Sequence, residues 1–340
     1  MVFVLGIESS CDDTCVAIIN NNEILANVII SQHIEQKPYA GVVPEIAARS
    51  HVTNIQTAFL RALEEAKIRS DQIDVVAASC GPGLIGGVMV GCVFGKTLAS
   101  ILKKPFIAVN HLEGHALMVR LVYKLDYPYL LLLVSGGHSQ FIQVRGLGRY
   151  KILGTTLDDA VGEAFDKVAK MLNLGFPGGP EIERRASKGF PIYDLPKPLI
   201  NQDHCNLSLS GLKTAAKLLI EKLAPMDEQK INDVCASFQQ VVAQMLRVKT
   251  LKAMQLYEQF ETGGGERSFV LSGGVGANLY IRQMLTQSAA EMGYNFLVPP
   301  INLCTDNGVM IAQAGWERFC AQKQNDLLFR PRARWSLEEK

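Results

Sequence analysis

The sequence lacks the features that would place it outside the class of soluble globular proteins. Its formal net charge is only +1, from 34 Lys and Arg against 33 Asp and Glu, so no charge of one sign indicates a nucleic-acid or membrane partner. We expect no apolar run of the ~18 residues that a membrane span needs, and the first residues carry neither a basic leader nor a cleavage signature. These absences predict a cytoplasmic protein that binds no membrane.

Metal-binding cysteine patterns are also missing. The eight cysteines are scattered, mostly through apolar segments. Cys11 and Cys15 flank a turn but lack the second pair that a structural zinc site requires. In a chain without a secretion signal, we expect these cysteines to be free thiols rather than disulfides.

What the sequence does contain is enough apolar material, 48% of 340 residues, for two or three cores, and an order of elements that occurs twice. The expected first copy has strands at 2–7, 16–19 and 24–30, a helix from Pro44, a strand at 74–79, a helix at 88–102, a strand at 106–110 and a helix at 113–122. The expected second copy has strands at 129–134, 141–145 and 150–155, a helix at 159–172, a helical insertion at about 180–260, a strand at 268–272, a helix at 278–292, a strand at 296–298 and a helix at 307–320.

The repeated order βββαβαβα predicts the α/β class, with two mixed sheets covered by helices and two domains facing a cleft. We expect the first domain to comprise 1–125 together with 307–325, and the second to comprise 126–306. The remainder, 326–340, is a basic tail that either contacts phosphate or is simply solvated. Ligands are expected at the carboxyl ends of strands, between the domains.

Two glycine-rich turns follow strands at equivalent ends of the duplicated fold. Ser135-Gly136-Gly137-His138 joins two strands, whereas 272–278 (SGGVGAN) follows a strand and opens a helix. Glycines there let backbone amides approach a phosphate or a planar ring. Either turn alone is more typical of tight-turn chemistry. Together with 81–83 (GPG), they favour nucleotide binding.

The turn at 6–14 (GIESSCDDT) gathers three carboxylates and three hydroxyls. Ser and Asp are ordinary turn formers, but clustered carboxylates are costly unless a cation neutralises them. We interpret Asp12 as the functional acid of this turn.

His111 and His115 lie four residues apart, on one face of a helix, which suits a shared metal ion. Glu113 is not placed as in the zinc-peptidase signature. Asp306, at the start of the last expected helix and thus in the second copy, can supply a third ligand. Two histidines and a carboxylate are typical of non-haem iron and of some zinc sites. Three other histidines, His33, His51 and His204, are expected to be surface or structural.

Eight motifs, taken in order, resemble those of a known family over about residues 4–320. They are GIESSCDDT (6–14), NHLEGH (110–115), VSGGH (134–138), GEAFDK (162–167), FPGGP (176–180), SLSGLKT (208–214), SGGVGAN (272–278) and CTDNG (304–308). In these the chain resembles the bacterial tRNA N6-adenosine threonylcarbamoyltransferases. The resemblance implies the ASKHA fold, named for its occurrence in actin, hexokinase and Hsp70.

The resemblance also implies an activity: transfer of threonylcarbamoyl from threonylcarbamoyl-AMP to N6 of the adenine 3′-adjacent to the anticodon, in tRNAs reading ANN codons. His111, His115 and Asp306 match the family's metal ligands, with Fe²⁺ expected and Zn²⁺ as the alternative. Asp12 matches an acid important for activity. The matched substrate-binding positions are Leu133, Val134, Ser135, Gly136, Gly137, Asp166, Gly179 and Asn278, with Glu183 as a weaker candidate.

Two departures place the chain in the bacterial branch of this family. Leu133 stands where archaeal and eukaryotic members have a tyrosine metal ligand, and His138 stands where they have asparagine. The metal would therefore have a more open shell. The resemblance further implies helper proteins, an ASKHA paralogue (TsaB-like) and a small P-loop ATPase (TsaE-like).

Other functional classes remain open at this point. A metalloprotease would need a general base beside the histidine pair, and Glu113 is poorly placed for that role. A non-catalytic or ATP-driven ASKHA scaffold is a second alternative. A sugar kinase is a third, which the two histidines and the aspartate argue against.

Overall fold

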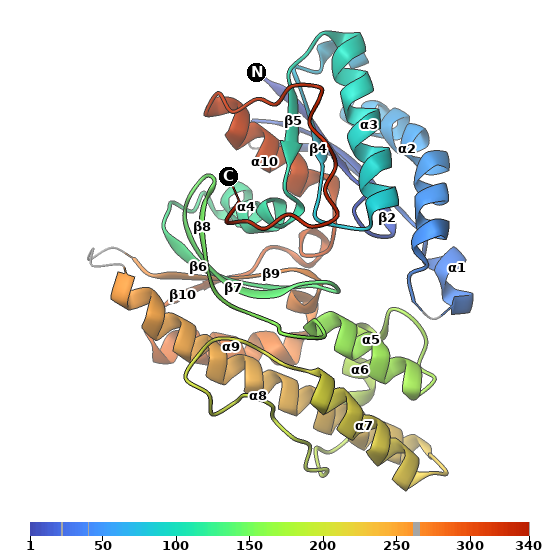
Figure 1. Cartoon of the computed structure of the whole chain (residues 1–340), viewed down its shortest axis with the longest axis vertical. Coiled ribbons are helices and arrows are strands. Elements are labelled where there is room, and N and C mark those ends of the chain that lie inside the picture. Colours follow the sequence, from blue (N-terminus) through green and yellow to red (C-terminus); the bar gives the residue numbers. More distant parts are fainter. Residues whose placement is uncertain (22, 40, 261–265, 340) are drawn as a thin grey trace. The chain divides into compact units, whose positions relative to one another are not determined.

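The computed structural model describes residues 1–21, 23–39, 41–260 and 266–339, and it forms two compact units (Figure 1). The first unit comprises Met1–Asp126, Gly146–Arg149 and the chain from Thr305 onward; the second comprises Tyr127–Arg145 and Tyr150–Cys304. The expected boundary at 125/126 therefore shifts by one residue and the boundary at 306/307 by two, so that Asp306 belongs to the first unit rather than the second. The last residue of the expected tail, Lys340, lies outside the described residues.

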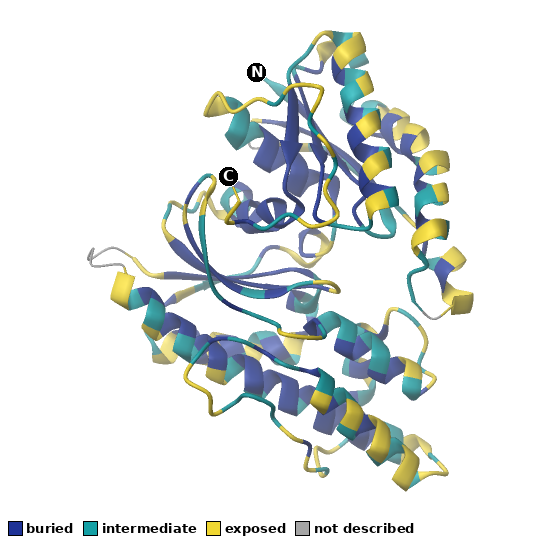
Figure 2. Ribbon diagram, viewed as in Figure 1, coloured by how far each residue is buried: buried dark blue, intermediate teal, exposed yellow. Residues whose placement is uncertain are grey.

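The first unit is a five-stranded sheet with helices on both faces. Its elements are β1 (Phe3–Glu8), β2 (Asp13–Asn20), β3 (Glu23–Ser31), α1 (His33–Gln36), α2 (Pro44–Ala66), β4 (Val75–Ser79), α3 (Ile85–Leu102), β5 (Phe106–Val109), α4 (His111–Tyr123) and α10 (Gly308–Cys320). The sheet order is β3-β2-β1-β4-β5, with β1 antiparallel to β2 and parallel to β4. Strands β1, β2, β4 and β5 are almost wholly buried, as expected for a sheet covered on both sides (Figure 2).

Helix α10 lies directly on the first strand, which is distant in sequence. A Cβ added to Gly6 would lie 2.2 Å from the carbonyl oxygen of Gly308. A Cβ added to Gly308 would in turn lie 2.5 Å from the backbone nitrogen of Ala17 on β2. Any larger side chain at either glycine would push α10 off the sheet. Helix α10 thus belongs to the same unit as the N-terminal strands.

The second unit has its helices gathered on one core. Its elements are β6 (Tyr129–Val134), β7 (Ser139–Gly146), β8 (Arg149–Thr155), α5 (Val161–Met171), α6 (Gly178–Ala186), α7 (Ser210–Leu223), α8 (Glu228–Phe260), β9 (Ser268–Ser272), α9 (Leu279–Glu291) and β10 (Asn295–Leu297). The sheet order is β10-β9-β6-β7-β8. Buried Leu132 and Phe141 of the sheet share this core with Phe165 and Phe238, whose rings are 5.2 Å apart.

The order βββαβαβα occurs twice along the chain, so the predicted duplication is confirmed, with α6, α7 and α8 as the helical insertion of the second copy. The last helix of that second copy, α10, belongs to the first unit. Helix α4 begins at His111, two residues before the expected start, because the side chain of Asn110 accepts a hydrogen bond from the backbone N–H of Leu112. The short helix α1 was not expected.

The expectation that no segment reaches the length and hydropathy of a membrane span was wrong for α3. In the described part of the chain, this helix meets that test by length and composition, with a third of its residues buried. Its glycines nonetheless pack closely on the first unit: a Cβ added to Gly91 would lie 2.2 Å from Oγ of Ser9, just after β1, and a Cβ added to Gly95 would lie 3.0 Å from Cβ of Ala78 in β4. A helix packed on a sheet can pass the same test, so the finding is weak evidence for a membrane.

All eight cysteines are free thiols in the structure, as predicted.

Candidate metal centre and substrate site

The structure brings His111, His115 and Asp306 together within the first unit. His115 Nε2 lies 3.1 Å from Asp306 Oδ1, and His111 Nε2 lies 3.7 Å from the same oxygen. One donor atom from each of the three side chains can be chosen so that all lie within 4.8 Å of one another. Because the imidazoles are almost wholly buried and Asp306 is about one-quarter exposed, the group has one open side. These three residues could hold a metal ion.

Local sequence explains how α4 and α10 deliver these ligands. Asn110 starts α4 at His111, so the two imidazoles, one turn apart, share a face, with rings 4.8 Å apart. Asn307 caps α10 by accepting a hydrogen bond from Met310 N at 3.0 Å, and the residue before it is the third candidate ligand.

Glu8 is a functional candidate that the sequence reasoning missed. Its carboxylate is fully buried, and Oε2 lies 2.9 Å from Nδ1 of His111. Ser10 Oγ lies 3.0 Å from the same nitrogen. If Nδ1 carries the proton and donates it to Glu8, the lone pair of Nε2 points toward Asp306, which is the tautomer a metal ligand needs. The only sequence signal was the membership of Glu8 in the acidic turn.

The electrostatics of this cluster favour a cation. Burial lowers the pKa of His111, but the negative charges of Glu8 and Asp306 outweigh burial and raise that pKa to about 9. Burial likewise works to raise the pKa of Glu8, whereas the charge and hydrogen bond of His111 hold it below its usual value. Two carboxylates around one imidazole therefore attract positive charge, either a proton or a metal ion. Metal binding at neutral pH would release that proton.

Asp12 and Asp13 occupy the same acidic turn and are both half-buried. Burial raises the pKa of Asp12, and the charge of Asp306 raises it further, against a hydrogen bond from Cys11. Burial and the charge of Asp12 raise the pKa of Asp13 to about 6. The cost expected for clustered carboxylates is thus present, and Asp12 is a stronger proton acceptor than a solvated aspartate.

His51 is structural, and its place is in the core rather than on the surface. It is fully buried, with Nδ1 2.8 Å from Thr14 Oγ1 and Nε2 3.1 Å from the carbonyl oxygen of Cys11. These contacts tie the acidic turn to α2.

Glu113 is also fully buried and accepts a hydrogen bond from Arg318 Nε at 2.8 Å. An arginine-bound carboxylate is a poor general base, which weighs against the metalloprotease alternative.

In the second unit, the turn after β6 presents two open glycines. Ser135 closes the turn, because its N–H donates to the carbonyl of His138 at 2.8 Å and its Oγ accepts from His138 N–H at 3.1 Å. Among the described residues, no atom lies within 4 Å of a Cβ added to Gly136 or Gly137, and neither glycine has a positive φ. Neither packing nor backbone strain therefore explains these glycines, whereas close approach of a ligand would. Leu133 and Val134 end β6 and are buried.

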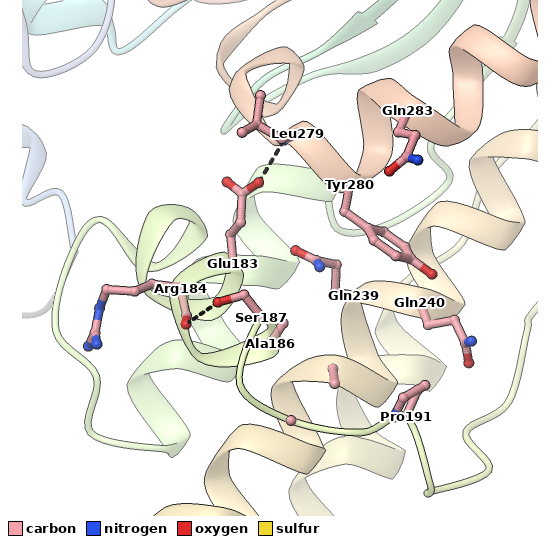
Figure 3. Close-up of a pocket in the computed structure, with 12 residues that line it drawn as sticks. Glu183, Arg184, Ala186, Ser187, Pro191, Gln239, Gln240, Leu279, Tyr280 and Gln283 are labelled. Atoms are coloured by element: carbon pink, nitrogen blue, oxygen red, sulfur yellow. Dashed lines mark hydrogen bonds between the residues drawn. The ribbon is translucent and has the colours of Figure 1, made fainter.

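The other predicted substrate-binding residues bracket helices α5, α6 and α9 of this unit. Asp166 on α5 accepts a hydrogen bond from Gly178 N–H at 2.7 Å, next to Gly179, whose added Cβ would meet no described atom within 4 Å. Glu183 on α6 accepts from Leu279 N–H at 2.6 Å (Figure 3). These carboxylates fix the helix ends to each other, and they leave the backbone at Gly179 accessible.

Asn278 is committed to structure through both ends of its amide. Its Oδ1 accepts from Ile281 N–H at 2.9 Å and caps α9, and its Nδ2 donates to Gln239 Oε1 at 2.8 Å. A substrate contact from Asn278 would have to replace one of these bonds or come from its backbone. Its assignment to the substrate stays a prediction, as do the other assigned roles.

A pocket of about 590 Å³ opens between α6, α8 and α9 (Figure 3). Gln239 and Gln240 of α8 line it, together with Tyr280 and Gln283 of α9 and Glu183 of α6. Its walls are mainly apolar with a few amide and carboxylate groups, which is typical of a small-molecule site.

Comparison with known proteins identifies the relatives of this chain. The model of the family TsaD, described as tRNA N6-adenosine threonylcarbamoyltransferase, matches residues 23–313. A protein of that name from Rickettsia rickettsii (strain Sheila Smith) is 55% identical over 341 residues, covering 100% of this chain and 99% of the relative. Another from Rickettsia bellii (strain OSU 85-389) is 56% identical over 338 residues, covering 99% of each.

Solved structures of low identity show the fold. HypF from T. kodakarensis matches with a TM-score of 0.61 and 15% identity, covering 94% of this chain and 48% of HypF. The activator of the 2-hydroxyisocaproyl-CoA dehydratase from Clostridium difficile, with bound ADPNP, matches with a TM-score of 0.52 and 15% identity, covering 95% of this chain and 97% of the activator. The predicted duplicated ASKHA fold is confirmed.

Proposed function

The chain belongs to the family of tRNA N6-adenosine threonylcarbamoyltransferases, and we propose which of its residues carry out each part of the reaction. It transfers a threonylcarbamoyl group to N6 of an adenosine in tRNA. The donor in this proposal is threonylcarbamoyl-AMP, and the acceptor is the adenine 3′-adjacent to the anticodon in tRNAs reading ANN codons. Full-length identity of 55% to a named transferase carries the proposal.

His111, His115 and Asp306 hold a divalent metal ion in this proposal, with Fe²⁺ as the expected ion and Zn²⁺ as the alternative. Two imidazole nitrogens and one carboxylate oxygen converge there, and Glu8 fixes the tautomer of the first imidazole. When bound, the metal supplies Lewis-acid polarisation of the carbamoyl group. Three protein ligands would leave room at the metal for substrate oxygens or water.

The second unit binds the adenylate part of the donor. The open glycines 136 and 137 let backbone amides approach a phosphate, and the mainly apolar pocket between α6, α8 and α9 suits the adenosine. Because AMP is already a good leaving group, most of the catalytic effect is expected from positioning and charge stabilisation.

Asp12 orients and deprotonates the attacking amine. The bond from N6 to the carbamoyl carbon forms, the bond from that carbon to the phosphate oxygen breaks, AMP departs, and the N6 proton passes to Asp12. A carboxylate whose pKa is raised by burial and by the charge of Asp306 is a better acceptor for that proton than a solvated one.

The decisive experiment is reconstitution with tRNA and threonylcarbamoyl-AMP, read out by mass spectrometry of the nucleosides. The wild-type protein with metal should form threonylcarbamoyladenosine, and the variants His111→Ala and His115→Ala should lose both metal binding and transfer. Full turnover by these variants would contradict the metal's role. Peptide cleavage by the metal-loaded protein, without tRNA modification, would favour the protease alternative.

We also propose a cytoplasmic location, because the substrate is tRNA, and two helper proteins, a TsaB-like paralogue and a TsaE-like ATPase. The exposed apolar side chains of α2 and α3 offer the paralogue a surface: Val52, Met89 and Val93 are 65%, 49% and 55% exposed. They line a groove of about 500 Å³. Charged substitutions at Met89 and Val93 should abolish complex formation in size-exclusion chromatography, and an unchanged complex would place the interface elsewhere.

A further inference from the structure

The C-terminal segment 325–337, here termed the C-terminal strap, is docked along the first unit, contrary to the expectation that it is a phosphate contact or a solvated tail. At its start, Asn325 pairs with the edge strand β5. Its N–H donates to the carbonyl of Phe106 at 3.0 Å, and its Oδ1 accepts from Ala108 N–H at 2.9 Å. The strap therefore extends the sheet at the strand that leads directly into α4.

Two aromatic side chains anchor the strap. Phe329 and Trp335 are partly buried and pack against the core of the first unit, with ring centroids 5.3 Å apart. The guanidinium of Arg332 lies 5.4 Å and 5.2 Å from these two rings. Such aromatic and cation–π contacts indicate a fixed conformation for the strap.

Backbone hydrogen bonds also join the strap to the loop after β4. Arg332 N–H donates to the carbonyl of Cys80 at 2.8 Å, and Gly83 N–H donates to the carbonyl of Ala333 at 3.2 Å. Gly81 has a φ of +130°, and a Cβ there would lie 1.9 Å from the carbonyl oxygen of Arg332. Only glycine permits this close approach of the two backbones.

The strap is linked to His111 by two routes. In the first, the N–H of His111 donates to the carbonyl of Gly81 at 2.7 Å, and Gly81 belongs to the loop that the strap contacts. The preceding residue, Asn110, donates from Nδ2 to the carbonyl of Trp335 at 3.1 Å, while its Oδ1 caps α4 through Leu112. The strap thus contacts both groups that fix the start of α4.

We propose that the C-terminal strap is a positioning element for the metal centre: it holds Asn110 and Gly81, and through them it orients His111 toward Asp306. The inference rests on the proposed metal site. Outer partners that orient ligands commonly alter metal affinity by ~10–100-fold. The strap extends such support beyond Glu8 to a segment more than 200 residues away in the sequence.

The test measures the dissociation constant for Zn²⁺ by competition with a chromophoric chelator, in the full chain. Asn110→Ser keeps a cap for α4 but loses the donor to Trp335, and Trp335→Ala removes the anchoring ring. Each should weaken Zn²⁺ binding at least ~10-fold. Leu328→Ala is the matched control, because this side chain belongs to the same strap but is 82% exposed. The Zn²⁺ affinity of this variant should stay within about twofold of the wild type.

Circular dichroism establishes whether each variant is folded. If Trp335→Ala does not fold, Asn110→Ser decides the question. Wild-type Zn²⁺ affinity in a folded Asn110→Ser variant overturns the role of the strap. His111→Ala separates the two proposals: if that variant still binds Zn²⁺ like the wild type, the metal site itself is wrong, whereas its failure to bind leaves only the strap under test.

Discussion

Glu8 Oε2 lies 2.9 Å from Nδ1 of His111, so a fully buried carboxylate from the first strand holds a candidate metal ligand from a helix more than 100 residues later. The partner of Nδ1 decides which way Nε2 presents its lone pair. A residue of this kind acts on the metal through the imidazole, without binding the metal itself.

Replacing Glu8 should therefore weaken metal binding. Glu8→Gln preserves the size of the side chain but removes the negative charge and can present an N–H to Nδ1, which favours the wrong tautomer. We expect the Zn²⁺ dissociation constant to rise ~10–100-fold, as measured by chelator competition. Gln56→Ala is the control, because this exposed side chain of α2 should not affect the Zn²⁺ dissociation constant. Unchanged affinity in Glu8→Gln would show that His111 needs no such partner.

Asp12→Asn should separate binding from chemistry. The amide keeps the shape of the side chain but cannot accept the N6 proton. Transfer to tRNA should fall by ~10²–10⁴-fold in single-turnover assays, because that is the usual contribution of a general base. Affinity for the donor, measured by calorimetry with threonylcarbamoyl-AMP, should stay within about twofold. A large loss of donor affinity would instead assign Asp12 to the substrate pocket.

Gly136→Ala tests the open turn of the second unit. Its added Cβ meets no described atom within 4 Å, so the free energy of unfolding should change by less than about 0.5 kcal/mol in urea titrations. Donor affinity should fall by at least ~10-fold, which corresponds to about 1.4 kcal/mol, if the ligand approaches the backbone there. Gly293→Ala is the contrasting variant, because its φ of +71° makes alanine strained: it should lower stability while leaving donor binding intact. Wild-type donor affinity in Gly136→Ala would remove this turn from the substrate site.

Asp158 should stabilise the protein in a pH-dependent way. Burial raises its pKa, but hydrogen bonds from the hydroxyls of Ser208 and Ser210 and from the backbone N–H groups of Leu209 and Ser210 outweigh burial and lower it to about 2. A folded-state pKa below the unfolded value of 3.8 means that the stabilisation is full above about pH 5 and disappears as the pH falls through about 2.

The variant Asp158→Asn should accordingly melt at a lower temperature than the wild type at pH 7, by a difference equivalent to about 1 kcal/mol. That difference should shrink as the pH is lowered from 4 toward 2, provided that both proteins remain folded. A difference in melting temperature that is independent of pH over this range would mean that the charge of Asp158 contributes nothing.

Much of the fold could be predicted because the periodicity of its apolar residues is local information. The i, i+4 spacing placed His111 and His115 on one face of a helix, and the structure brings Asp306 to them. We expected Asp306 in the second domain, whereas the structure groups it with the first unit, because a boundary between units depends on packing that no short pattern encodes.

Side-chain direction in the acidic turn could not be predicted either. Three carboxylates lie within six residues, and only the pleat of β1 with its register against β2 turns Glu8 toward His111. The C-terminal strap was misread for a related reason. Its arginines suggested a solvated or phosphate-binding tail, whereas Phe329 and Trp335 anchor it to the core of the first unit.

The packing of α10 against Gly6 has a consequence for synthesis on the ribosome. Because the opening strands need helix α10, which begins at Gly308, the first unit cannot reach its final packing until α10 has emerged from the ribosome. The second unit is translated entirely before that point, and domains generally fold as units during translation. We therefore expect the second unit to fold first, while the N-terminal strands of the first unit remain without the helix that covers them.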